Sequence, residues 1–271
     1  MVKELRISSV HATTREETND LVAIEEPLEI QLQVSGQQPE TVSITMRTPG
    51  DDLALAVGFL WGEGVLTSFD QIDTARSYVI RVSNQVCTAL TSGSKPNISQ
   101  LQRNFYTTSS CGVCGKSSLD LIKQKSQFAV LPQEPILTVD TVHALSGTVR
   151  REQATFEQTG GLHAAALLDS NGTLITLRED VGRHNAVDKA IGSQILANQL
   201  PLSDRVLFLS GRASFELIQK ASMAGIAVVA AVGAPSSLAV ELAQSTGITL
   251  IGFLRDGRFN IYSGSQRIAQ D

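Results

Sequence analysis

Two cysteines separated by two residues lie in a segment rich in serine, threonine and glycine, residues 107–118. In such a segment Cys111 and Cys114 are expected to be accessible to solvent, and an accessible thiolate can act as a nucleophile or as a metal ligand. The chain contains only one further cysteine, Cys87. The sequence therefore concentrates its sulfur chemistry at one point.

The residues that follow the pair favour the thiolate form. Ser117 and Asp120 have the spacing of a helix capping box, so a helix is expected to begin directly after the cysteines. The positive end of that helix and the ammonium group of Lys116 would both lower the pKa of a nearby thiol. The pattern predicts a reactive thiolate at this position.

Three kinds of chemistry use such a pair, and the residues alone leave all three open. A zinc site needs four ligands, and only Cys87 and four histidines could complete one. A redox pair of the thioredoxin kind is expected where a strand meets a helix inside a βαβ unit, whereas this pair follows a polar stretch, residues 91–102. The third alternative is a pair that carries sulfur.

A histidine at the start of an apolar run, His163, is a further candidate. Zinc deaminases place a histidine two residues before a catalytic glutamate and follow it with a Pro-Cys-x-x-Cys motif. Here Ala165 occupies the glutamate position, and the cysteine pair precedes the histidine. Deaminase catalysis is therefore not expected, although a related scaffold is allowed, and a buried histidine explains His163 equally well.

Polar clusters also occur where strands are expected to end. The turn within residues 178–189 contains Arg183, His184 and Asn185, to which the sequence assigns no specific role. Arg183 could bind an anion at a helix start, or the turn could be an ordinary solvated one. Residues 210–214 and 233–237 follow predicted strands at the edge where open α/β sheets bind ligands, although helix capping explains them as well.

Two arginines, Arg255 and Arg258, flank a turn near the C-terminus. Arginine side chains recognise phosphate groups well because their donors form a planar fork. The Asp256-Gly257 pair between them is also a strong signal for an exposed hairpin turn, and spacing alone favours the hairpin.

The first half of the chain is predicted to be a small α+β unit. Apolar residues at every second position indicate strands over residues 28–34, 42–46 and 78–82. Thr48 is predicted to cap a helix with Pro49 at its first position. Gly62 and Gly64 are expected to end that helix.

The second half alternates between apolar strands and helices. Strands are predicted over residues 164–168, 174–177, 205–210, 226–232 and 249–253, with a short edge strand at 259–262. Helices are predicted over residues 185–196, 215–224 and 236–244, the last two capped by Ser214 and Ser236. Unbroken apolar strands between helices indicate a buried parallel sheet with crossover helices. Pro132 and Pro135 mark the boundary between the two halves.

Composition narrows the class of protein. The net charge of −5 argues against a broad nucleic-acid surface. Three cysteines cannot build a disulfide framework, and the odd count fits a reducing compartment. The N-terminus shows no signal-peptide pattern, and the most apolar stretch, residues 226–234, is shorter than the roughly 20 residues that span a bilayer. A cytoplasmic protein without membrane association is expected.

Several of these motifs occur together in a fixed order. They are Thr48-Pro49 through Gly58-Phe-Leu and Glu63-Gly64, Cys111-Gly-Val-Cys114-Gly-Lys116, Gly160-Gly161-Leu-His163, Glu179-Asp-Val-Gly-Arg183-His184-Asn185, Ser210-Gly-Arg212 and Gly252 through Arg258. This ordered set resembles the FdhD-type formate dehydrogenase accessory sulfurtransferases and covers nearly the whole chain. Several motifs in order are far more specific than any one of them.

The resemblance implies a sulfur carrier. Members of that family take sulfur from a cysteine desulfurase as a persulfide and pass it to the molybdenum cofactor, a bis-molybdopterin guanine dinucleotide, before its insertion into formate dehydrogenase. It implies that Cys111 carries the persulfide and that Cys114 assists. It also implies a cofactor-binding stretch made of Phe253, Leu254, Arg255, Asp256, Gly257 and Arg258.

The same resemblance implies an α/β fold in two domains. Residues 132–271 are expected to form a cytidine deaminase-like three-layer domain. Residues 1–131 are expected to form a smaller α+β domain that ends in the cysteine loop and its following helix. A homodimer is expected, with the molybdenum cofactor as a bound substrate and no permanent metal.

Two other functions compete with sulfur transfer. A thiol-disulfide oxidoreductase would form a reversible disulfide between Cys111 and Cys114 and would need no desulfurase. A non-catalytic chaperone would hold the molybdenum cofactor or formate dehydrogenase without moving sulfur, so it would work without its cysteines. A zinc deaminase is a more distant alternative.

Overall fold

The computed structural model describes residues 1–98, 126–131, 133–255 and 257–269. Both cysteines of the pair therefore lie outside the described residues, as do Lys116, Ser117 and Asp120 of the predicted helix start, and Asp256 of the predicted turn. Among the described residues, no helix is long and apolar enough to cross a membrane.

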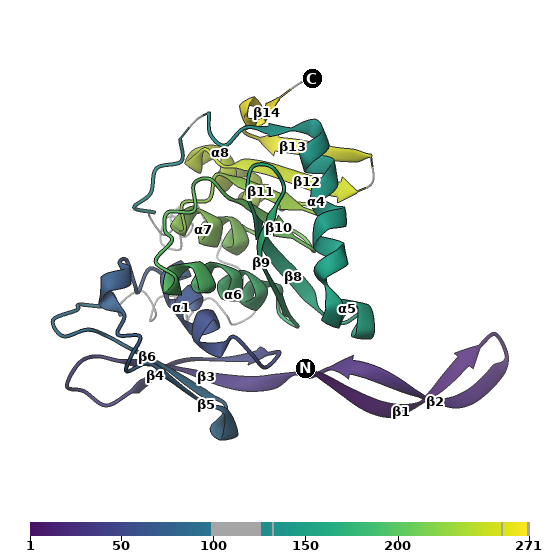
Figure 1. The fold of residues 1–271 in the computed structure, drawn as a ribbon, viewed down its shortest axis with the longest axis horizontal. Coiled ribbons are helices and arrows are strands. Elements are labelled where there is room, and N and C mark those ends of the chain that lie inside the picture. Colours follow the sequence, from purple (N-terminus) through teal and green to yellow (C-terminus); the bar gives the residue numbers. More distant parts are fainter. Residues whose placement is uncertain (99–125, 132, 256, 270–271) are drawn as a thin grey trace.

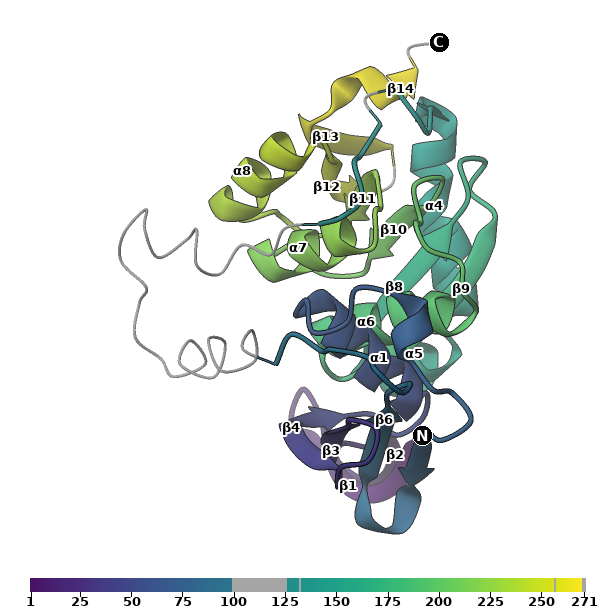
Figure 2. The same cartoon turned by 90° about the vertical axis from the view of Figure 1, so that its left-hand side faces the viewer.

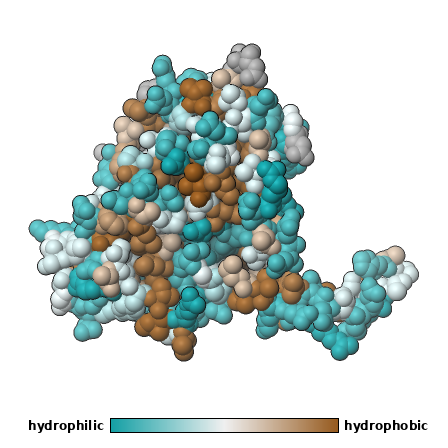
Figure 3. Space-filling view, viewed as in Figure 1, coloured by the Kyte–Doolittle hydropathy of each residue, from teal (hydrophilic) through white to brown (hydrophobic). Residues whose placement is uncertain are grey.

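The chain begins with a long antiparallel hairpin that the sequence did not predict. Strands β1 (Val2–His11) and β2 (Thr14–Ala23) pair over their whole length and project from the body of the molecule (Figure 1). The outer half of the hairpin is mostly hydrophilic on the face that Figure 3 shows. Because both faces of this ribbon are largely exposed, its strands lack the apolar alternation from which strands are predicted.

A four-stranded sheet follows, and it confirms the strands predicted over residues 28–34 and 42–46. Its order is β4 (Glu40–Arg47), β3 (Glu26–Gln33), β6 (Gln85–Ala89) and β5 (Tyr78–Ile80). The predicted strand 78–82 is shorter than expected, because Val82 lies in the 3-10 turn Arg81–Ser83.

The side chains of β4 that are buried are not all those that its sequence pattern predicts. The alternation at Val42, Ile44 and Met46 suggests one common face, but the pairing of β3 with β4 shifts register between Ile30 and Gln31. Such a bulge moves the following residues to the opposite face. Val42 is buried, whereas Ile44 and Met46 are 69% and 48% exposed.

Helix α1 (Asp52–Gly62) confirms the predicted helix, but its start differs from the expectation. Neither Thr48 nor Pro49 belongs to it: the residue before the helix is Asp51, whose backbone is left-handed with φ 55°. Thr48 contacts another part of the chain instead, where its hydroxyl oxygen accepts a hydrogen bond from the Val181 N–H at 3.2 Å. The sequence pattern predicted that Thr48 would cap the helix that follows it. In the structure its hydroxyl instead contacts a residue that is distant in the sequence.

The second half is built on a six-stranded sheet, and its predicted strands are confirmed. In spatial order these are β13 (Arg258–Ser263), β12 (Thr249–Arg255), β11 (Val228–Ala231), β10 (Val206–Leu209), β8 (His163–Leu168) and β9 (Leu174–Asp180). The expectation of a parallel sheet holds only for β10, β11 and β12. The other three strands pair antiparallel, since β8–β9 and β12–β13 are joined by connections too short for a crossover.

Helices cover both faces of this sheet, which gives three layers (Figure 2). Helices α6 (Arg183–Leu196), α7 (Phe215–Met223) and α8 (Ser237–Thr246) lie on one side and confirm the prediction. Helices α4 (Val139–Glu152) and α5 (Ala154–Thr159), which the sequence analysis did not predict, lie on the other. The mixed α/β class is thus observed, while the cytidine deaminase-like arrangement stays a prediction.

The smaller elements complete the chain. A two-stranded pair joins β7 (Leu137–Thr138) to β14 (Ile268–Ala269), and 3-10 turns occur at Phe69–Gln71 and Ser265–Arg267. Ser236 caps α8 as predicted, through its hydroxyl and the Ala239 N–H. Ser214 precedes α7 but does not cap it with its side chain; its hydroxyl lies 3.4 Å from Nε2 of His184.

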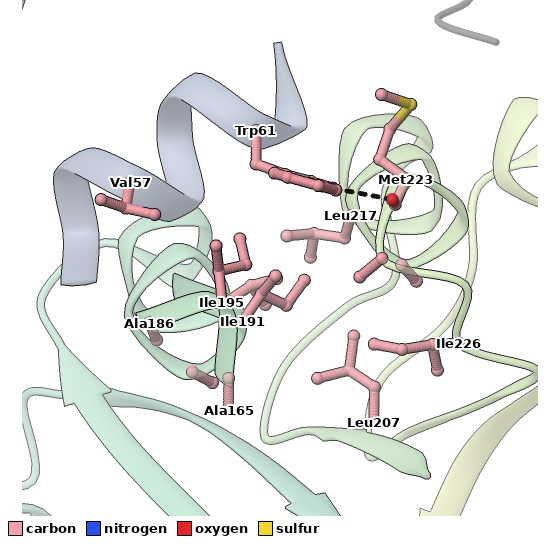
Figure 4. Packing of buried hydrophobic residues seen from close by; sticks show 14 of the residues in the cluster. Val57, Trp61, Ala165, Ala186, Ile191, Ile195, Leu207, Leu217, Met223 and Ile226 are labelled. Carbon is pink, nitrogen blue, oxygen red and sulfur yellow. Dashed lines mark hydrogen bonds between the residues drawn. The ribbon is translucent and has the colours of Figure 1, made fainter. Parts of the chain in front are cut away.

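One hydrophobic core runs through both halves of the chain. Trp61 of α1 packs among Ile191 and Ile195 of α6, and its indole N–H donates to the Met223 carbonyl at 2.8 Å (Figure 4). The division into domains at residue 131 stays a prediction, and the core is continuous across it.

Helices α1 and α6 approach closely enough that glycine is required at the contact. A Cβ atom on Gly58 would lie 2.0 Å from the Asp188 carbonyl oxygen, and one on Gly192 would lie 1.9 Å from the Ala54 carbonyl oxygen. Both obstacles are backbone atoms, so no side-chain rearrangement can relieve them. The small residues therefore fix how the two halves fit together.

We expect Gly58→Ala to lower the free energy of unfolding by about 3 kcal/mol, because the helices must separate to admit the methyl group. Urea unfolding followed by circular dichroism measures this. The matched control is Gly147→Ala in α4, where a Cβ meets nothing closer than 3.8 Å; alanine should be neutral or stabilising there. Equal effects at both positions would contradict the close-contact explanation.

Candidate functional site

A cavity of about 700 Å³ opens where the parallel strands end. Ser210 follows β10, Val232 follows β11, and Arg255 ends β12, and all three line the cavity. On the other side it is closed by α4, α5 and the glycines that follow α5. Its volume suits part of a small-molecule ligand or cofactor, and its position is the edge where open α/β sheets bind ligands.

The charge of the cavity wall is positive. Arg150 and Arg255 line it, and no aspartate or glutamate does so among the described residues. The Arg150 guanidinium lies over the Phe156 ring, with its carbon 4.5 Å from the ring centroid. Within the described part of the chain, neither arginine forms an ion pair with a carboxylate. Stacking orients one guanidinium while leaving its donors free, which suits a site for an anion.

His163 is placed at the same edge, as the first residue of β8. Burial, together with the nearby charges of Arg183 and His184, lowers the pKa of His163. Its imidazole is therefore neutral at pH 7, so it can accept a hydrogen bond as well as donate one. The residue is half-buried and lines the cavity, and a functional role for it stays a prediction.

The structure brings only part of the predicted cofactor stretch to the cavity. Leu254 is buried in the wall, and Arg255 lies at the rim. Phe253, Gly257 and Arg258 are not among the lining residues, and Asp256 lies outside the described residues. The cofactor-binding role of this stretch stays a prediction.

Three polar residues at the end of β9 and in the first turn of α6 have a structural role. Glu179 accepts hydrogen bonds from the backbone N–H groups of Thr155 and Phe156, at 3.1 and 2.8 Å, and so caps α5. The Asn185 amide donates to the Met46 carbonyl oxygen at 2.7 Å, which ties α6 to the N-terminal sheet. Asp180, the third of these residues, forms a buried ion pair.

That ion pair joins Asp180 to Lys189 at 2.6 Å, with the two side chains 0% and 2% exposed. The Lys189 ammonium also donates to the Thr48 carbonyl oxygen at 2.7 Å, and the Thr48 N–H donates to Asp180 at 3.2 Å. Residues about 130 positions apart thereby form one network. Sequence reasoning could not find it, because no local pattern pairs these residues.

The two remaining residues of the turn, Arg183 and His184, begin helix α6 and are not among the residues that line the cavity. Arg183 is close enough to His163 to influence its pKa, and its Nε atom is buried without a hydrogen-bond partner among the described residues. His184 lies 3.6 Å from a Glu216 carboxylate oxygen, and this interaction lowers the pKa of Glu216 to about 2. The turn thus combines structural residues with an arginine and a histidine at the start of α6.

Sequence reasoning missed the wall that α4 and α5 provide. A signal was present: Val142, Leu145 and Val149 have helical spacing, and the Thr138 hydroxyl caps the helix by accepting from the Thr141 N–H. Within the described ranges, no group of three His, Cys, Asp or Glu side chains could hold a metal ion.

The fold and the cavity define a class of protein, a three-layer α/β protein with an arginine-lined cavity at the carboxyl edge of its parallel strands. The chain belongs to the FdhD/NarQ family, whose family model matches residues 23–269. The resemblance found in the sequence is thereby confirmed.

Curated relatives match over nearly the full length of the chain. Proteins named sulfur carrier protein FdhD are 49% identical in Streptomyces avermitilis and 48% identical in Mycobacterium tuberculosis. These matches cover 98% and 97% of this chain, and 94% and 95% of the relatives. A crystal structure described as a putative formate dehydrogenase accessory protein from Desulfotalea psychrophila shares the fold, with a TM-score of 0.76, 24% identity and 99% coverage of both chains.

Proposed function

We propose that this chain is a sulfur carrier for formate dehydrogenase. It accepts sulfur as a persulfide on Cys111 from a cysteine desulfurase, and Cys114 assists. It passes the sulfur to the molybdenum cofactor, a bis-molybdopterin guanine dinucleotide, before the cofactor enters formate dehydrogenase. The observation that carries this proposal is the 49% identity, over 98% of the chain, to a relative named as a sulfur carrier.

The first chemical step is a thiol–persulfide exchange. The Cys111 thiolate attacks the outer sulfur of the desulfurase persulfide, a new S–S bond forms on Cys111, and the desulfurase cysteine leaves as a thiolate. No electrons are gained or lost overall, so no separate oxidant or reductant takes part. The step needs an accessible thiolate of low pKa, which the sequence around the pair favours.

The cavity supports the second part of the proposal. The molybdenum cofactor is the substrate there, and its nucleotide portions carry phosphate groups. Arg150 and Arg255 supply guanidinium donors without competing carboxylates in the described wall. The volume of about 700 Å³ is sufficient for one nucleotide portion rather than for the whole cofactor. A homodimer, a cytoplasmic location and a cytidine deaminase-like C-terminal domain belong to the same proposal.

Incubation with a cysteine desulfurase and cysteine labelled with sulfur-35 tests the proposal. We expect the chain to acquire label that dithiothreitol removes, because a persulfide is reducible. A variant with all three cysteines replaced by alanine serves as the control. Label no higher than in that control would overturn sulfur transfer and favour a chaperone that binds the cofactor without moving sulfur.

A further inference from the structure

Three basic side chains lie together beside the cavity, where β9 leads into helix α6. His163 is paired with Asp180 in the antiparallel ladder of β8 and β9, and Arg183 and His184 follow that residue after a short turn. The charges of Arg183 and His184 both act on the His163 imidazole. We call these three residues the basic cluster. Only His163 lines the cavity, so the cluster adjoins the cavity without being part of it.

Arg183 is the member of the cluster that has no protein partner. Its Nε atom is buried without a hydrogen-bond partner, and within the described part of the chain its guanidinium pairs with no carboxylate. Buried polar atoms nearly always have partners, so an orphaned one calls for an explanation such as a ligand or an ion. A guanidinium in this state is suited to bind an anion.

The carboxylates around the start of α6 are engaged elsewhere. Asp180 forms the buried ion pair with Lys189. Glu179 accepts from the backbone N–H groups at the start of α5. Glu216 lies 3.6 Å from His184. None of these groups offsets the charge of the arginine in the cluster, and an uncompensated positive charge attracts anions from solution.

The histidine of α6 is held in place by the neighbouring helix. Ser214 occupies the position before α7, where a serine hydroxyl usually caps the helix. Here the hydroxyl makes no such bond and lies 3.4 Å from Nε2 of His184. Together with Glu216 it supports the imidazole from the α7 side. Such support is a feature of preorganised binding sites, whose side chains are fixed before a ligand arrives.

We propose that the basic cluster is a second anion site, which binds the anionic metal end of the cofactor while a nucleotide portion occupies the cavity. The Arg183 guanidinium binds a small oxyanion through its planar donors, and His163 donates a hydrogen bond to it from the cavity side. The identity of the ligand rests on the proposed function, whereas the anion site rests on the side chains of the cluster.

Calorimetric titration with molybdate, an oxyanion of the same metal, tests the site with and without saturating GDP in the cavity. We expect the wild-type chain to bind molybdate under both conditions, because the arginine of the cluster does not line the cavity. Arg183→Gln should weaken molybdate binding at least about tenfold, since charge-assisted hydrogen bonds are lost. Its affinity for GDP should change less than about twofold.

Two further variants and one spectrum complete the test. Arg183→Lys keeps the charge without the planar fork, so its affinity for molybdate should lie between those of the wild type and Arg183→Gln. Arg81→Gln is the matched control, because Arg81 is exposed in the 3-10 turn after β5, and it should bind molybdate as the wild type does. Thermal melting shows that each variant is folded. Molybdate should also shift the imidazole NMR signals of His163 and His184 in the wild-type chain, a result that depends on no variant.

The inference fails on any one of three results. They are a wild-type chain that does not bind molybdate, displacement of molybdate by GDP, and equal affinity of Arg183→Gln and the wild type for molybdate. Displacement would place molybdate at the phosphate positions of the cavity instead. None of these measurements involves the cysteines or the labelling experiment, so failure of the second anion site is distinguished from failure of sulfur transfer.

Discussion

Replacing Cys111 by alanine is expected to reduce sulfur-35 labelling by a cysteine desulfurase to the level of the variant without cysteines. The proposed reaction forms an S–S bond on this thiolate, and alanine has no atom that could replace it. The measurement is the label that dithiothreitol releases from the purified chain. Complementation of formate dehydrogenase activity in cells should be lost in parallel.

Cys87 provides the matched control. It lies on β6 with 0% exposure, and burial raises the pKa of its thiol, so it is neither accessible nor readily ionised. Cys87→Ala should therefore retain labelling, and Cys114→Ala shows whether the second cysteine accepts sulfur or only assists. Full labelling of Cys111→Ala would assign the carrier role to another cysteine.

Replacing Asp180 by alanine is expected to lower the free energy of unfolding by about 3–5 kcal/mol. The change leaves the Lys189 ammonium buried, and among the described residues the Thr48 carbonyl oxygen is then its one hydrogen-bond partner. It also removes the acceptor for three hydrogen bonds, from the backbone N–H groups of Thr48 and Gly182 and from the Asn185 amide. Urea unfolding gives the difference, provided that the transition is two-state.

A double variant tests whether the buried charge causes this loss. Adding Lys189→Met removes the unpaired ammonium, so Asp180→Ala with Lys189→Met should be more stable than Asp180→Ala alone. An exposed pair supplies the comparison: Arg6 and Glu17 lie 3.7 Å apart with side chains 77% and 54% exposed, and Glu17→Ala should have no measurable effect. Simple additivity of the two changes at Asp180 and Lys189 would contradict the explanation.

The strands and helices were predicted correctly where their burial gives the sequence a recognisable pattern of apolar residues. The strands at residues 164–168 and 226–232 were predicted because both of their faces are covered, which makes them continuously apolar. The N-terminal hairpin has no such apolar pattern in its sequence, since its residues are largely exposed. The bulge that turns Ile44 outward was also hidden, because a shift in pairing depends on the partner strand.

The sequence by itself determined the family: an ordered set of motifs around one close cysteine pair in a polar segment identifies the FdhD/NarQ family. Only the tertiary structure decided which residues line the cavity. Arg150, Gln153, His163 and Arg255 come from separate elements and meet at the edge of the sheet. Local patterns reflect neighbours within a few residues, whereas a cavity depends on how helices and strands from distant parts of the chain pack together.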